Sequence, residues 1–150
     1  MIRKGFTLIE ILVTLSLVIL LTSAGVMVSI NNIQRNLVSE GGSDLKSMLV
    51  QARDYALAGR KISCTTSLKG WQVDINTSAK RAVLLEVCGS TTPFITKNFS
   101  SSLTLSVTGS SSILFTTVTG GTNLTTNSVT TISNSLTNTF VTVTPGGTIQ

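Results

Sequence analysis

Few residues in this sequence could do chemistry, and one of them is a carboxylate in an unusual place. Glu10 is the only charged residue in the 25-residue, largely apolar stretch from Phe6 to Ile30. A carboxylate within a membrane-spanning helix costs about 2.5–3.5 kcal/mol at mid-depth, so such a residue usually has a function. If the chain is cut between Gly5 and Phe6, the new α-amine lies one helical turn from Glu10. The carboxylate could then pair with the α-amine of a neighbouring copy when helices bundle.

The side chains used in most enzymes are missing. The sequence contains no histidine, which excludes His-based triads, most zinc sites and the commonest general base near neutral pH. No phosphate-binding or dinucleotide-binding glycine motif is present. Asp74 and Glu86 lie in predicted strands and are the remaining candidates for a catalytic pair, but a charge on a strand face is usually only solvated. We therefore expect no catalytic residues, no metal, no cofactor and no enzymatic activity.

The two cysteines, Cys64 and Cys88, lie in different predicted strands. In an oxidising compartment they could form a disulfide, which would stabilise the fold by roughly 3–4 kcal/mol on the chain-entropy model. Two buried thiols are the alternative, because a disulfide requires the two Cα atoms to be close together.

The element that must position Glu10 is a long apolar helix. Apolar residues surround it, and 25 residues at about 1.5 Å each can cross a hydrocarbon core of about 30 Å. Arg3 and Lys4 precede it and favour a cytoplasmic N-terminus. A secretory signal cleaved near Ala24 is one alternative, but its apolar region would be too long. A plain membrane anchor is another, but it does not explain Glu10.

The segment from Arg3 to Glu10, RKGFTLIE, resembles the class III leader motif of type IV prepilins and type II secretion pseudopilins. The resemblance implies cleavage after Gly5 by a prepilin peptidase, N-methylation of Phe6, and Glu10 as the carboxylate used in subunit assembly. It also implies the partners: other pilin or pseudopilin subunits, the prepilin peptidase, an inner-membrane assembly platform and the lipid bilayer. The protein would start as a single-pass inner-membrane protein with an extracytoplasmic head, and would then enter a filament.

Taken as a whole, the sequence predicts an α+β fold, in which a long N-terminal transmembrane helix packs on a small antiparallel β-sandwich or meander. The expected divisions are a leader (1–5), a transmembrane assembly helix (6–30), a helix continuation and packing helix (31–61), and a β-rich head (62–150).

We expect a helix break at Glu40–Ser43 and a stop near Gly59. The helical face expected to pack on the head comprises Leu45, Met48, Leu49, Ala52, Tyr55 and Ala56. Alternating apolar residues and turn signals predict six to eight strands, including Ile62–Thr66, Trp71–Ile75, Ala82–Cys88, Leu103–Val107, Ile113–Val118, Val129–Ile132 and Phe140–Val143.

The head resembles the GspH/FimT group of minor pseudopilins and minor pilins. The residues that carry this resemblance are the helix Leu49–Arg53–Ala56, Cys64, the strand from Trp71 to Val73, Ile113–Phe115, and the terminal strand and turn from Phe140 to Gly147. It implies a structural subunit of a type II secretion pseudopilus or a type IV pilus, with a β-sandwich head on the second half of the helix.

A DNA-binding receptor for natural transformation is the alternative function. Some members of this group bind DNA through a basic C-terminal tail, but here the tail from Gly147 to Gln150 is uncharged. Because phosphate contacts are largely electrostatic, a neutral tail removes the main source of affinity, so DNA is not an expected partner. The basic residues that could still form a patch are Arg53, Arg60, Lys61 and Lys69, and a solvated helix end is the simpler interpretation.

Overall fold

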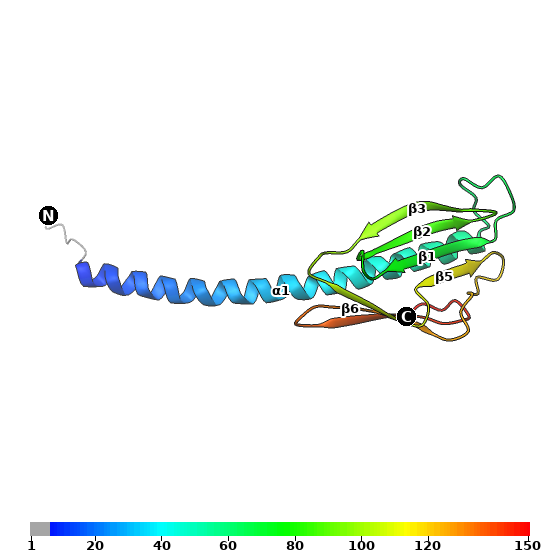
Figure 1. Ribbon diagram of the computed structural model, residues 1–150. Helices are drawn as coiled ribbons and strands as arrows, with labels where there is room; N and C mark the ends of the chain where they lie inside the picture. The colour runs from blue at the N-terminus through cyan, green and yellow to red at the C-terminus, as the bar shows by residue number, and fades with distance from the viewer. Residues whose placement is uncertain (1–6) are drawn as a thin grey trace.

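The computed structural model describes residues 7–150, apart from the side chains of residues 23–28. Helix α1 runs from Leu8 to Leu57 over 50 residues. Seven strands follow within the described residues: β1 (Gly70–Asn76), β2 (Arg81–Val87), β3 (Thr91–Asn98), β4 (Thr104–Thr108), β5 (Ser112–Thr116), β6 (Ser128–Ser133) and β7 (Asn138–Val143). The strands gather around the C-terminal half of α1, and its N-terminal half extends away from them (Figure 1). We call residues 8–30 the rod and residues 38–150 the head.

The strands form two antiparallel sheets that both pack on α1. The first has four strands in the order β3-β2-β1-β5, and the second has three in the order β4-β6-β7. Strands β1, β2 and β3 form an antiparallel meander, and β5 returns to pair with the free side of β1. The prediction of a long helix packed on antiparallel strands is therefore confirmed.

Helix α1 is unbroken through Glu40–Ser43, so the predicted break there is wrong. Gly41 and Gly42 are both buried, and they let the strands approach the helix closely. A Cβ atom on Gly41 would lie 3.3 Å from Leu103, and one on Gly42 would lie 2.6 Å from Thr139. Packing of the surrounding residues evidently outweighs the cost of about 1 kcal/mol for each glycine in a helix.

The helix ends where the sequence predicts. Leu57 is its last residue, and Gly59 follows with a φ of +58°, a left-handed conformation that suits glycine. The amide of Arg60 then donates a 2.9 Å hydrogen bond to the Tyr55 carbonyl, which closes the last turn.

Two strand predictions fail around the edge of the four-stranded sheet. Residues Ile62–Thr66 form a loop, and the unpredicted strand β3 spans Thr91–Asn98. Pro93 reads as a strand breaker, but β3 is an edge strand, where proline costs no ladder hydrogen bond. The pairing of β2 with β3 is also irregular between Leu84 and Leu85, next to the proline.

The core of the head lies between α1 and the two sheets. The predicted helical face is buried at every position except Tyr55, which is half-buried. Trp71 of β1 and Phe115 of β5 lie opposite each other in register, and both are fully buried. The other buried apolar side chains of the strands include Val73, Ile75, Ala82, Leu84, Leu105, Ile113, Ile132, Val141 and Val143. The head therefore uses the C-terminal half of α1 as part of its own core.

One ion pair fastens the exposed strand β3 to α1. Lys97 Nζ lies 2.8 Å from Asp44 Oδ2. The hydrogen bond to the Asp44 carboxylate, together with its charge, raises the pKa of Lys97 above its ordinary value. A raised lysine pKa adds stability that is fully present below the ordinary value and is lost as the pH rises through the folded-state pKa. The pair is therefore intact at neutral pH, and its partial exposure keeps its contribution small.

Candidate functional site

The rod carries a large apolar surface that the head does not cover. Between Leu8 and Leu21, eleven large apolar side chains are between 50% and 78% exposed: Leu8, Ile9, Ile11, Leu12, Val13, Leu15, Leu17, Val18, Ile19, Leu20 and Leu21. They occupy all sides of the helix, because only three residues between 8 and 21 are not among them. Contiguous exposed apolar surface of this extent marks a site of contact with protein or membrane.

Three hydroxyl groups on the rod form hydrogen bonds within the helix itself. Each donates a hydrogen bond of 2.8–2.9 Å to a carbonyl of the preceding turn: Thr14 to Glu10, Ser16 to Val13, and Thr22 to Val18. In an apolar environment an unpaired hydroxyl is costly, and back-bonding to the helix removes that cost. These three polar residues are therefore suited to surroundings that offer no hydrogen-bond partners.

Glu10 lies in the first turn of α1, as predicted. Its amide donates a 3.1 Å hydrogen bond to the Thr7 carbonyl, and its side chain is exposed. No cationic side chain in residues 7–150 forms an ion pair with its carboxylate. The predicted cleavage and methylation residues, Gly5 and Phe6, lie outside the described residues, so the proposed pairing with the α-amine stays a prediction.

A membrane-spanning helix was predicted for residues 6–30. Among the helical residues that the structure describes, none makes a segment both long and apolar enough to cross a bilayer.

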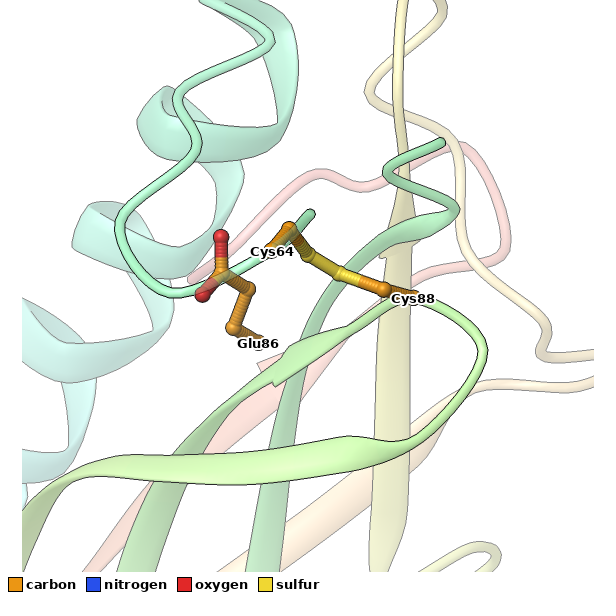
Figure 2. Close-up of side chains that lie close together, drawn as sticks. All are labelled: Cys64, Glu86 and Cys88. Carbon is orange, nitrogen blue, oxygen red and sulfur yellow. A yellow bond between two sulfur atoms is a disulfide. The ribbon is translucent and has the colours of Figure 1, made fainter. Parts of the chain in front are cut away.

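The predicted disulfide is present. Cys64 and Cys88 are bonded, with their Cα atoms 6.2 Å apart, and the bond joins the loop after α1 to the end of β2 (Figure 2). The Glu86 carboxylate lies beside it, and its oxygen and the two sulfur atoms lie within 4.8 Å of one another. This group has the composition of a metal site, but the two sulfurs are bonded to each other. Neither is a thiolate, the form of cysteine that binds metal ions.

Glu86 holds the same loop by a second device. Its carboxylate is buried, at 2% exposure, and accepts hydrogen bonds from two successive backbone amides, Ile62 at 2.8 Å and Ser63 at 2.7 Å. Charge-assisted hydrogen bonds of this kind compensate the cost of burying the carboxylate. The cluster of disulfide and carboxylate is therefore a latch for the loop at residues 58–69.

The structure does not bring Asp74 and Glu86 together as a pair. Glu86 lies on the buried face of β2, opposite Trp71 in register. Asp74 lies on the other face of the sheet and is half-buried. Its carboxylate accepts a 2.8 Å hydrogen bond from the side-chain amide of Gln72. The role of Glu86 was not predicted, although the alternation of β2 carried a signal. Ala82, Leu84 and Glu86 share one face, so a carboxylate in this series must be buried and needs hydrogen-bond donors.

The basic residues of the alternative function are partly engaged within the head. The Arg60 guanidinium lies 4.4 Å from the centre of the Tyr55 ring, a cation–π contact. Lys61 donates a 2.8 Å hydrogen bond to the Thr66 carbonyl. Arg53 is half-buried and Lys69 is exposed. These contacts hold two of the four cations close to the head, at the end of α1 away from the rod.

The uncharged C-terminal tail is bound to the head as well. Ile149 forms a β-bridge with Val143, and Gln150 exchanges two 3.0 Å backbone hydrogen bonds with Thr142. The tail thus covers the edge of strand β7 and is not a free arm.

Comparisons with protein families, with curated proteins and with solved structures find no match for this chain. The class of protein is therefore defined by the fold alone. It is an α+β chain whose long N-terminal helix packs on two antiparallel sheets, an architecture consistent with the shape of a pilin.

Proposed function

We propose that this chain is a structural subunit of a type II secretion pseudopilus or a type IV pilus, as a minor pseudopilin or minor pilin. The observation that carries the proposal is the exposed apolar rod, which extends from a head that is already folded without it. Burying a large aliphatic side chain yields about 1.5–3 kcal/mol, so covering eleven half-exposed ones is worth on the order of 10 kcal/mol. A subunit with such a surface is driven into lipid or against other apolar helices.

In this proposal the rod lies first in the lipid bilayer and later against the apolar helices of other subunits. The sequence from Phe6 to Ile30 supplies the membrane span before assembly, and this segment includes positions whose side chains the structure does not describe. A prepilin peptidase removes residues 1–5 and leaves an N-methylated Phe6. Neighbouring copies or other pilin-like subunits then bury the rod in the filament. The disulfide supports an extracytoplasmic head, since disulfides persist in oxidising compartments.

In this assembly, the Glu10 carboxylate sets the axial position of each subunit relative to its neighbour. It is exposed, has no cationic partner in residues 7–150, and lies one helical turn from the residue that cleavage would make N-terminal. In an apolar bundle an unpaired carboxylate is strongly unfavourable, so an axial position that brings Glu10 to a neighbour's α-amine is favoured over others.

The mature N-terminus is the first test. The chain is co-expressed with a prepilin peptidase and its methyltransferase activity, and the intact mass is measured. The expected product begins at Phe6 and carries one methyl group, and a Gly5→Leu variant keeps the full leader. A product that begins at Met1 or at Gly25 would remove the basis of the proposal.

The second test measures entry into filaments in a host with a compatible assembly system. We expect Glu10→Leu to lower incorporation at least about tenfold, because its removal leaves a neighbour's α-amine unpaired. Glu40→Leu is the matched control, since Glu40 is an exposed carboxylate on the same helix but within the head. Equal incorporation of both variants and the parent would contradict the role of Glu10.

A further inference from the structure

The β6–β7 hairpin is the part of the head that lies beside the emerging rod (Figure 1). Its loop is fixed to the helix, because Asn134 Nδ2 donates a 2.6 Å hydrogen bond to the Gln34 carbonyl. The Asn134 Oδ1 atom in turn accepts from the amides of Leu136 at 2.9 Å and Thr137 at 3.0 Å. One asparagine therefore shapes the loop and sets its position along α1 at the level of Gln34.

This level is close to the end of the apolar stretch. Gln34 is four residues after Ile30, which at about 1.5 Å per residue is about 6 Å along the helix axis. The headgroup layer adds about 5–8 Å to each side of a hydrocarbon core of about 30 Å. If the rod spans the bilayer up to Ile30, the hairpin loop lies within the headgroup layer.

The side chains at this level suit a lipid surface. Leu136 is 45% exposed at the tip of the hairpin, and Ile33 of α1 is 54% exposed beside the end of the rod. Arg35 is exposed and is the only charged residue in the segments 31–39 and 128–150. Exposed apolar side chains with a cation and no acid are the composition of surfaces that lie on anionic membranes.

We infer that, before assembly, the head rests on the membrane through this hairpin, with Leu136 at the boundary of headgroups and acyl chains and Arg35 attracted to the net negative charge of anionic lipids. The inference rests on the membrane-spanning state of the proposed function and adds a second lipid contact to it. Lipid is the favoured occupant because the patch continues the apolar surface of the rod and carries a single positive charge. Because the head is built on α1, the contact fixes the rotation of the whole subunit about the helix axis, and it is released when the subunit leaves the bilayer.

Depth-dependent quenching of tryptophan tests the contact in the full chain. The chain has one native tryptophan, Trp71, which is fully buried. A Leu136→Trp variant is reconstituted in vesicles of phosphatidylethanolamine and phosphatidylglycerol that carry a headgroup spin label. The control is Val118→Trp, in an exposed loop whose Gly120 lies against Leu57 at the far end of α1. We expect about threefold stronger quenching for Leu136→Trp than for the control, since only the hairpin reaches the headgroups.

Two further measurements separate the possible failures. Leu15→Trp, quenched by a spin label in the acyl chains, reports the span itself, and its lack of quenching would refute the membrane state of the proposed function. If Leu15→Trp is quenched but Leu136→Trp behaves like Val118→Trp, only the hairpin contact is refuted. Arg35→Gln, combined with Leu136→Trp, should reduce quenching in vesicles with phosphatidylglycerol and leave it unchanged in phosphatidylethanolamine with phosphatidylcholine. An equal effect in both would exclude the role of Arg35 as an anion contact.

Discussion

Replacing Glu86 by glutamine should destabilise the head although the two side chains have nearly the same shape. The Glu86 carboxylate accepts from two backbone amides, those of Ile62 and Ser63, at 2.8 and 2.7 Å. A glutamine offers one acceptor oxygen and one donor nitrogen. One of the two amides would therefore face an NH₂ group and lose its partner in a buried site.

The magnitude follows from the two bonds. Losing one hydrogen bond to a charged group costs about 1.5–3 kcal/mol, and the surviving bond loses its charge assistance, which costs about 1 kcal/mol more. Relief from burying a charge at 2% exposure offsets part of this sum. We expect Glu86→Gln to lower the free energy of unfolding by about 2 kcal/mol, which is a large share of the stability of a small domain.

Urea unfolding of the full chain in detergent, followed by the fluorescence of Trp71, measures this loss. Trp71 lies directly opposite Glu86 in the β1–β2 register, so the probe reports the part of the sheet that holds the loop. Asp74→Asn is the matched control, because it makes the same change in a half-buried carboxylate that holds no loop, and its effect should stay below about 0.5 kcal/mol. Equal unfolding midpoints for Glu86→Gln and the parent would refute the latch.

Three other changes test the packing of the head in the same assay. Cys64→Ser and Cys88→Ser together should lower the free energy of unfolding by roughly 3–4 kcal/mol, because the unfolded chain loses a cross-link over a separation of 24 residues. Gly42→Ala should lower it by about 1 kcal/mol, since the new Cβ would lie 2.6 Å from Thr139 Cγ2, and adding Thr139→Ser should restore it. Val118→Gly should raise it by about 1 kcal/mol, because this β-branched residue has a φ of +74° and is 86% exposed. A loss of stability in Val118→Gly, or no rescue by Thr139→Ser, would show that the local explanation is wrong.

The parts of the fold that the sequence predicts are those with a regular pattern over many residues. The helical face from Leu45 to Ala56 repeats at the helical period, and β1 alternates from Trp71 to Asn76, so both are placed correctly. The break at Gly41–Gly42 is wrong because sequence alone does not show that strands from the far end of the chain pack there. Strand β3 is also missed because the sequence does not show the order of the strands. Pro93 is tolerated in β3 only because β3 lies at the edge of its sheet.

The candidate site is predictable to different degrees in its two parts. The apolar rod and Glu10 are visible in the sequence because a lone acid in a long apolar run is rare, and the structure leaves that run uncovered. Only one part of the latch, the pair of cysteines, can be predicted from the sequence. Cys64 and Cys88 are noticed as a pair, but the partners of Glu86 are the amides of an irregular loop, Ile62 and Ser63. Backbone amides of a loop have no sequence signature, and the prediction of a strand there gave them other partners.

The two halves of the continuous helix α1 have different roles, so substitutions in the rod and in the head should affect different measurements. The C-terminal half of α1 buries one face, including Leu45 and Ala52, in the core of the head, whereas the rod contributes nothing to that core in the described residues. Glu10→Leu should therefore reduce entry into filaments and leave the unfolding midpoint of the head unchanged. Glu86→Gln should lower the midpoint and, at temperatures where the head is still folded, leave entry into filaments unchanged. If Glu10→Leu lowered the midpoint by as much as Glu86→Gln does, the rod would have to be part of the folding unit, and its exposed apolar surface would need a partner within the chain itself.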